Sequence, residues 1–175
     1  YSLLEQEDIS ALERGLSNLL HHIKTLRDTF GLPVVVALNR FVSDTPAELA
    51  LVEKACAAFG APVALSHVWE KGGAGGLDLA EKVIAAAESA QNATPRFAYD
   101  LSLPLREKLL AVTKRVYGGA SVTLTPRAEQ ELRDLERLGF GGLPVCIAKT
   151  QYSLSDDAKK LGAPEDFTLT VRSLR

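Results

Sequence analysis

The sequence contains no methionine, only two cysteines and a single tryptophan. A chain that begins at Tyr1 without any methionine is expected to be an internal piece of a longer protein. Cys56 and Cys146 lie far apart and belong to no CxxC motif or Cys/His cluster, which argues against a metal site or a disulfide framework. We therefore expect two buried thiols in a reducing cytoplasm.

Strong net charge and long apolar runs are also missing. A net charge of −2 without a basic run argues against a surface for nucleic acid or anionic membranes. No apolar stretch approaches the roughly twenty residues of a membrane-spanning helix, and the first residues do not form a signal peptide. With 46% hydrophobic residues, the composition is ordinary for a soluble globular protein.

Helices and short apolar strands alternate in the first half of the chain. Apolar residues recur at helical spacing over residues 9–29. Residues 34–38 and 62–66 are short apolar runs typical of parallel strands that are covered on both faces. Between them, a helix over residues 45–60 opens on Thr-Pro-Ala-Glu, which has the form of a capping box. This order predicts a right-handed βαβ unit in a parallel sheet.

A glycine-rich loop at residues 72–76 then leads into a third helix with one apolar face. That face is made of Leu77, Ala80, Val83, Ile84 and Ala87. A linker-like stretch follows at residues 89–96.

The second half repeats the plan with two helices and two strands. The helices are expected over residues 104–118 and 125–139, and the strands over 145–148 and 167–172. The last strand stops just before Arg175 without a closing element, which again suggests a fragment. We predict an α/β fold with a mostly parallel sheet and flanking helices in Rossmann-like or P-loop-NTPase-like layers. The predicted segments are residues 1–92 and 96–175, or one continuous domain.

Two large aromatic residues follow the first two predicted strands. Phe41 comes just after the first strand, and Trp69 just after the second. Ligands of open parallel sheets bind beyond the carboxyl ends of the strands, and neighbouring strands lie about 4.8 Å apart. The two rings could therefore hold a flat heterocycle, at roughly 1–3 kcal/mol for each good stack. Alternatively, they cover the top of the core, and the pattern alone leaves both interpretations open.

Polar residues beside these rings supply further candidates. Asn39-Arg40-Phe41 resembles the Asn-Lys-x-Asp loop of P-loop GTPases, but Val42 stands where the guanine-reading aspartate would be. A pocket of nucleobase size remains, without that specificity. Gly72, Gly73, Gly75 and Gly76 precede a helix and could cradle a phosphate, yet no GxxxxGK[ST] motif occurs in the chain. A mobile loop that closes over the slot is the favoured interpretation.

The polar segment at residues 149–157 follows the predicted strand 145–148. Lys149 is a candidate ligand contact there, whereas Ser155 could instead cap a short helix. The three histidines have no partner at nucleophilic or metal-ligand spacing, so no catalytic residue is assigned and no metal ligand is expected.

Three long strings carry a family resemblance: residues 32–41, 63–76 and 143–157. Together they resemble formate–tetrahydrofolate ligases, in the same order and at similar spacing over nearly the whole chain. The resemblance implies a homotetrameric enzyme that phosphorylates formate with ATP and Mg²⁺ and passes the formyl group from formyl phosphate to N10 of tetrahydrofolate.

The same resemblance implies roles for individual residues. A phenylalanine and a tryptophan matching Phe41 and Trp69 sandwich the pterin at a place that overlaps the adenine site, and Leu65 matches a position lining that pocket. The family usually has proline where Val42 stands, which predicts a less rigid loop. Its phosphate loop and formate-binding residues lie in an earlier region that this sequence lacks, so the chain alone is expected to be inactive. A stand-alone pterin or nucleotide module, or a segment that supplies oligomer contacts, are the alternatives.

Overall fold

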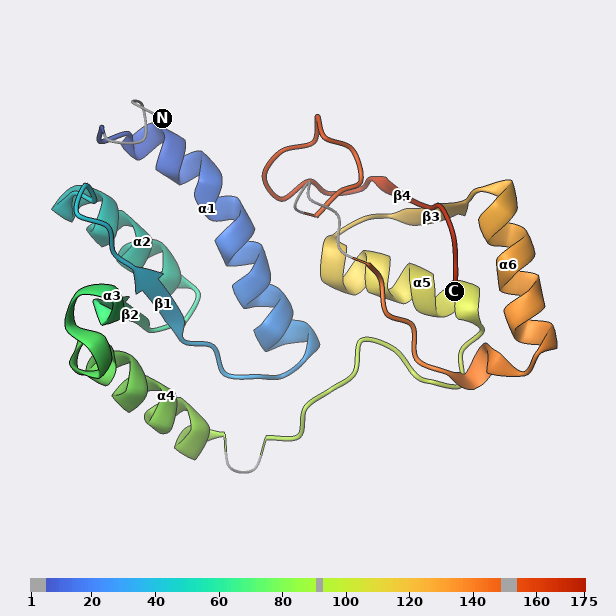
Figure 1. Cartoon of the computed structure of the whole chain (residues 1–175), viewed down its shortest axis with the longest axis horizontal. Coiled ribbons are helices and arrows are strands. Elements are labelled where there is room, and N and C mark those ends of the chain that lie inside the picture. Colours follow the sequence, from blue (N-terminus) through green and yellow to red (C-terminus); the bar gives the residue numbers. More distant parts are fainter. Residues whose placement is uncertain (1–5, 91–92, 149–153) are drawn as a thin grey trace. The chain divides into compact units, whose positions relative to one another are not determined.

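The computed structural model describes residues 6–90, 93–148 and 154–175. The chain forms two compact units, residues 1–95 and 96–175. Each unit contains one two-stranded parallel sheet with helices packed against it (Figure 1). The predicted α/β class with parallel strands is therefore confirmed. Among the described helices, none is long and apolar enough to cross a membrane.

The first unit opens with two helices that are linked at their amino ends. Helix α1 spans Ile9–Lys24 and continues as a π-helical turn, η2, Thr25–Thr29, while α2 spans Pro46–Ala58. The predicted capping box of α2 is present, since Thr45 and Glu48 exchange two hydrogen bonds. Glu48 also accepts the Asp8 amide at 3.2 Å. The amides of Thr45 first and Asp8 second lower the pKa of the Glu48 carboxyl.

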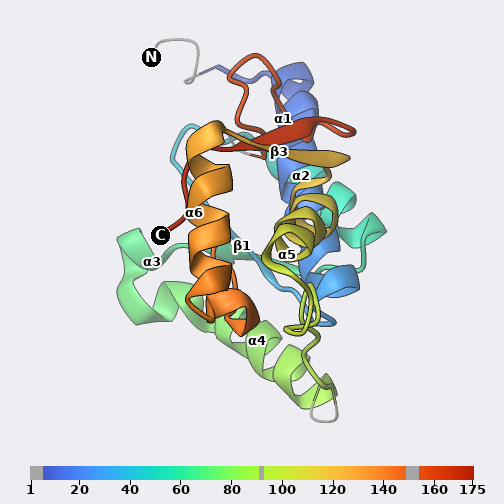
Figure 2. The ribbon, with the colours of Figure 1, turned by 90° about the vertical axis from the view of Figure 1, so that its right-hand side faces the viewer.

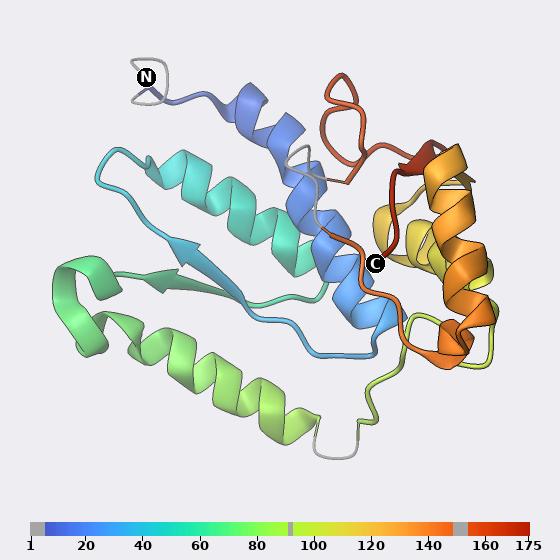
Figure 3. The ribbon, with the colours of Figure 1, turned by 45° about the vertical axis from the view of Figure 1, so that its right-hand side comes forward.

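Strands β1, Val36–Asn39, and β2, Val63–Ser66, pair in parallel with Val36 opposite Val63. Figure 3 shows α1 and α2 on one side of this pair and α4, Leu77–Ser89, on the other. The core on the α1–α2 side is made of Leu16, Ile23, Val36, Val52, Cys56 and Ala61. The sequence-based prediction of neighbouring parallel strands in this region is thus confirmed.

Helix α4 packs through a different face from the one predicted. Leu77, Val83 and Ile84 are 61%, 48% and 57% exposed, so the predicted apolar face points away from the sheet. The contact is made through the neighbouring face, where the Lys82 ammonium donates to the Val63 carbonyl at 2.7 Å. In this orientation Lys82 lies toward β2 and satisfies an edge carbonyl of the sheet.

The two edges of the β1–β2 sheet differ. In a parallel ladder the amide and carbonyl of one residue point to the same side. Since the Val36 and Arg40 amides donate to β2 or its flank, those of Ala37 point to the outer edge, where the described residues supply no partner. On the β2 edge, Lys82 takes the Val63 carbonyl and the His67 amide donates to Gly75. The β2 edge is therefore bonded at Val63 and His67, whereas the β1 edge is open at Ala37.

The second unit packs its helices on one side of its sheet, as Figure 2 shows. Apolar residues of both helices meet the inner faces of both strands in one core. In chain order the elements are α5, Leu105–Val112; η4, Thr113–Tyr117; β3, Ser121–Leu124; α6, Pro126–Arg137; η5, Phe140–Gly142; and β4, Thr168–Val171.

Strand β3 was not predicted, and the predicted strand 145–148 is wrong. Residues 145–148 are irregular, because the Tyr99 hydroxyl occupies both polar groups of Val145: it accepts the amide at 2.7 Å and donates to the carbonyl at 3.0 Å. The partner of β4 is β3, and Ser121 and Thr168 share a hydroxyl hydrogen bond of 2.7 Å. The predicted strand at the end of the chain is confirmed as β4.

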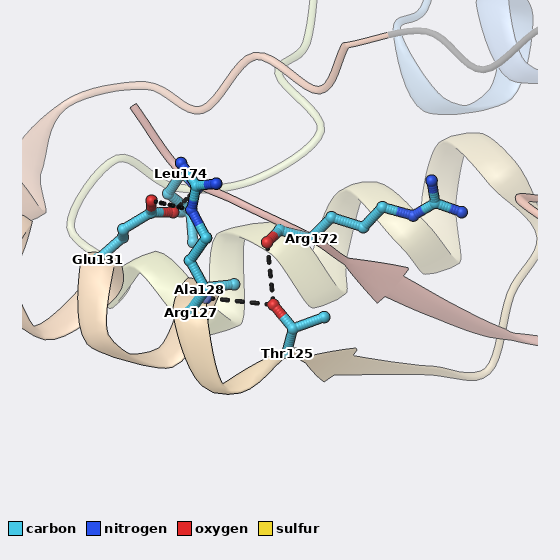
Figure 4. Close-up of polar contacts among 6 residues, drawn as sticks. All are labelled: Thr125, Arg127, Ala128, Glu131, Arg172 and Leu174. Carbon is cyan, nitrogen blue, oxygen red and sulfur yellow. Dashed lines mark hydrogen bonds and ion pairs between the residues drawn. The ribbon is translucent and has the colours of Figure 1, made fainter.

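Polar contacts hold the chain that leaves β4 against α6 (Figure 4). The Thr125 hydroxyl accepts the Ala128 amide at 3.2 Å and donates to the Arg172 carbonyl at 2.9 Å. Two residues later, the Leu174 amide donates to the Glu131 carboxylate at 2.7 Å. The cap of α6 thus also fixes the direction of the chain after the strand.

A fully buried lysine organises the segment after α6. The Lys108 ammonium donates to the carbonyls of Gly141 and Leu143 at 2.7 and 3.0 Å. These bonds satisfy two carbonyls that the short η5 turn would otherwise leave without donors. Lys108 therefore has a structural role in the second unit.

Candidate functional site

The carboxyl ends of β1 and β2 meet at one edge of the first sheet. The ladder pairs Asn39 with Ser66 at its last step, and the Arg40 amide still donates to the Ser66 carbonyl at 3.4 Å. Residues that follow the two strands therefore emerge side by side. This is the position at which parallel sheets bind ligands.

Trp69 links the two strand ends. It lies in α3, a one-turn helix over Val68–Lys71, directly after β2. The indole N–H donates to the Arg40 carbonyl at 3.0 Å, so the polar edge of the ring is fixed to the segment that follows β1. The side chain is nevertheless 61% exposed, which leaves ring surface free for a ligand.

Phe41 occupies the next position after Arg40 and is 64% exposed. The Phe41 amide donates to the Asp44 carboxylate at 2.8 Å, and the Asp44 amide returns a bond to the Phe41 carbonyl at 3.2 Å. This pair of bonds closes a tight turn, in which Val42 is 84% exposed. Asp44 thus holds the turn that contains Val42.

The glycine-rich segment is an ordered turn and not an irregular loop. Residues Gly72–Gly76 form a 3₁₀-helix, η3, between α3 and α4. The Gly75 carbonyl accepts the His67 amide at 3.0 Å, and a Cβ at Gly75 would lie only 2.4 Å from the His67 carbonyl oxygen. Gly75 is therefore needed for close approach of two backbones, and the segment braces the end of β2. The predicted closing motion stays a prediction.

The remaining predicted contacts are spread around the same edge. Asn39 is exposed at the end of β1, and Leu65 is half-buried on β2. A Cβ added at Gly73 would meet nothing within 4 Å, whereas Gly72 adopts φ 57°, a conformation that favours glycine. Lys149 lies outside the described residues.

The charged groups at this edge are mostly committed to local bonds. The Asp44 carboxylate accepts the Phe41 amide, and the His67 ring lies 3.6 Å from the Glu70 carboxylate. Arg40 differs, because its Nε atom is buried and has no hydrogen-bond partner among the described residues. Sequence reasoning missed the contribution of Asp44, whose carboxylate accepts an amide three residues earlier in the chain.

Other candidate chemistry outside this edge is limited. No group of three or more His, Cys, Asp or Glu side chains in the described ranges could hold a metal ion. Cys56 is buried, and burial raises the pKa of its thiol, but Cys146 is exposed, so the prediction of two buried thiols is wrong for Cys146. Ser155 caps no helix, since its hydroxyl accepts the Asp157 amide in an irregular turn.

Two cavities lie away from the aromatic pair. One, of about 370 Å³, is at the amino ends of the first two strands, beside Pro33 and Pro62. The other, of about 920 Å³, is in the second unit between α5, α6, β4 and residues 143–148. At the aromatic edge, Phe41 and Trp69 are both more than half exposed, which suits stacking on a flat molecule.

The sequence matches the model of one protein family, described as formate–tetrahydrofolate ligase, over residues 2–175.

Proposed function

Because the chain belongs to the formate–tetrahydrofolate ligase family, we propose that Phe41 and Trp69 form the stacking site for the pterin of tetrahydrofolate and for the adenine of ATP. The observation that carries this proposal is the hydrogen bond from the Trp69 indole to the Arg40 carbonyl. It anchors one ring beside the residue that precedes the other, while both side chains stay more than half exposed.

The chain contributes substrate binding to the ligase reaction. In the intact enzyme, formate would be phosphorylated by ATP with Mg²⁺, and the formyl group of formyl phosphate would pass to N10 of tetrahydrofolate. The described residues include no cluster of metal-binding side chains, so we assign no metal-dependent step to them. Their part is to fix the plane of the heterocycle and thereby the direction in which its reactive substituent points.

The neighbouring residues complete this site. Leu65 would contribute apolar contact to the edge of the bound ring, and Asn39 a polar group at the strand end. The η3 glycines would allow close backbone approach, with Gly75 holding the end of β2 in place. Lys149, the cytoplasmic location and the homotetramer stay predictions.

One observation supports an additional contact role. The apolar face of α4, with Leu77, Val83 and Ile84, is exposed. Such a face is typical of a surface that another protein segment covers. It favours oligomer contacts as the second candidate function, whereas no observation favours a module independent of the ligase reaction.

Substitution of Trp69 tests the stacking site. In Trp69→Ala, the dissociation constants of ATP and tetrahydrofolate should rise by the equivalent of about 1–3 kcal/mol, since one stacking surface is lost. Trp69→Phe should lose less affinity for both ligands, because it keeps an aromatic ring for stacking. It still loses some affinity, because phenylalanine cannot donate the hydrogen bond to the Arg40 carbonyl. Calorimetric titration of the chain, and Michaelis constants of the intact enzyme, would measure this.

Phe97→Ala is the matched control, because Phe97 is 85% exposed and lies in the other unit. It should leave both ligands unaffected. Unchanged binding in Trp69→Ala would mean that the two rings only cover the core.

A further inference from the structure

One nitrogen of the Arg40 guanidinium has no acceptor among the described residues. The residue is half-buried, and its Nε atom has neither solvent contact nor a hydrogen-bond partner among the described residues. No ion pair joins its guanidinium to a described carboxylate. Its backbone, in contrast, is fully used, since the amide donates to Ser66 and the carbonyl accepts from Trp69.

The acidic residues nearest in the sequence are already committed. Asp44 accepts the Phe41 amide. Glu48 accepts the amides of Asp8 and Thr45 with its two oxygens, and these bonds lower the pKa of its carboxyl. Neither forms an ion pair with Arg40 in the described part of the chain.

A buried donor without an acceptor carries a desolvation cost, so such groups call for a physical explanation. The guanidinium is planar, and its Nε–H together with one Nη–H forms a side-on fork that fits a carboxylate or phosphate. An acceptor that approaches the buried Nε edge would thus be an oxyanion. Because the Arg40 carbonyl is bonded to Trp69 and Phe41 is the next residue, the Arg40 backbone lies at the strand end that carries both rings.

We propose that Arg40 binds an oxyanion of the ligand whose ring stacks on Phe41 and Trp69. This inference rests on the proposed function, and it adds a charged contact that selects anionic ligands. The oxyanion is a phosphate when the ligand is ATP and a carboxylate when it is tetrahydrofolate. Arg40 makes the anionic ligand that it contacts bind more tightly than its uncharged counterpart, which is adenosine for ATP and a tetrahydropterin without the glutamyl tail for tetrahydrofolate.

Paired ligands separate the contribution of charge from that of stacking. Calorimetry and quenching of Trp69, the only tryptophan, would follow the binding of ATP, adenosine, tetrahydrofolate and the tail-less tetrahydropterin to the 175-residue chain. In Arg40→Gln, the dissociation constant of an anionic ligand should rise about ten-fold or more. The constants of the uncharged ligands should stay within about two-fold of the unsubstituted chain.

Two further variants keep the test specific. Arg40→Lys retains the charge but not the side-on fork, so its affinity for the anionic ligands should be intermediate. Lys54→Gln removes one exposed positive charge from α2 in the same unit and should leave all four constants unchanged. Added salt should weaken ATP binding to the unsubstituted chain more than to Arg40→Gln.

Each outcome either supports the anion contact of Arg40 or overturns it. A loss confined to ATP assigns the phosphate, and a loss confined to tetrahydrofolate assigns the carboxylate. If Arg40→Gln weakens charged and uncharged ligands equally, Arg40 only shapes the ring site and the inference is wrong. Unchanged binding of all four ligands also overturns it but leaves the stacking site intact. If no heterocycle binds the unsubstituted chain, the proposed function itself fails.

Discussion

Gly75, beside the aromatic edge, packs so closely against the backbone of His67 that a side chain cannot be added without a shift. Gly75→Ala would place a Cβ 2.4 Å from the His67 carbonyl oxygen, so η3 must shift away from β2. We expect a loss of about 1–3 kcal/mol in unfolding free energy, together with weaker heterocycle binding, measured by urea unfolding and calorimetry. Gly73→Ala is the control, because nothing lies within 4 Å of its added Cβ. Equal stability of the two variants would contradict the assignment.

The position of the aromatic residues could be predicted, whereas their anchoring could not. Phe41 and Trp69 each follow a short apolar run, which is visible in the sequence. The indole bond to Arg40 and the burial of one arginine nitrogen depend on how the two strand ends approach in space. Such tertiary contacts leave no periodic signal, and this also explains why the exposure of Cys146 was not predicted.

Glu131 provides a pH-dependent contact in the second unit. The Arg127 guanidinium first, and the Leu174 amide second, lower the pKa of its carboxyl. The group is therefore more acidic in the folded chain, so its contribution is complete above the unfolded pKa and is lost as the pH falls through the folded pKa. We expect the amide chemical shift of Leu174 to titrate with a midpoint below the usual glutamate pKa of about 4.3.

Glu131→Gln should keep an acceptor for the Leu174 amide without titrating. Its Leu174 shift should stay constant over the same pH range, apart from changes shared with other exposed amides. A Leu174 shift that moves equally in both proteins would show that Glu131 does not govern this contact.

At the scale of elements, the caps and ends of helices could be predicted from the sequence, but the pairing partners of the strands could not. The Thr45–Glu48 capping box and the glycines that end several helices occur where the sequence indicates. The strand at residues 145–148 was expected because its apolar run resembles that of β1. Tyr99 takes both polar groups of Val145 instead, while the alternating Ser121–Leu124 segment matches the hydroxyl-bearing face of β4.

Because the apolar face of α4 is exposed, truncation of two isoleucines should affect stability very differently. Ile84 is 57% exposed on α4, whereas Ile23 is 2% exposed in the core beneath α1. Ile84→Ala should change the free energy of unfolding by no more than about 0.5 kcal/mol, and Ile23→Ala should lower it by about 2–5 kcal/mol. Urea unfolding of both variants measures this difference. A large loss in Ile84→Ala would show that its face is covered in solution, as an oligomer contact requires.

At the scale of the whole chain, the two sheets are smaller than the predicted one. Two-stranded sheets need support from helices or further strands, and parallel strands normally have both faces and both edges covered. The β2 edge has such contacts at Val63 and His67, through Lys82 and Gly75, whereas the described residues supply none at Ala37 on the β1 edge. An added strand beside β1 would complete the sheet next to the aromatic edge, which suits a segment that works as part of a larger enzyme.

The activity of the chain by itself follows from what phosphoryl transfer requires. The sequence contains no GxxxxGK[ST] motif, and the reaction depends on positioned phosphates and bound metal ions. We therefore expect heterocycle binding without ATP- and formate-dependent formation of formyltetrahydrofolate, tested by a turnover assay on material cleared of host enzyme.

An intact ligase of the same family serves as the positive control. Trp69→Ala exposes any contaminant, since residual turnover unaffected by it would not come from this chain. Turnover that exceeds background and falls in Trp69→Ala would mean that these residues already assemble a complete catalytic site.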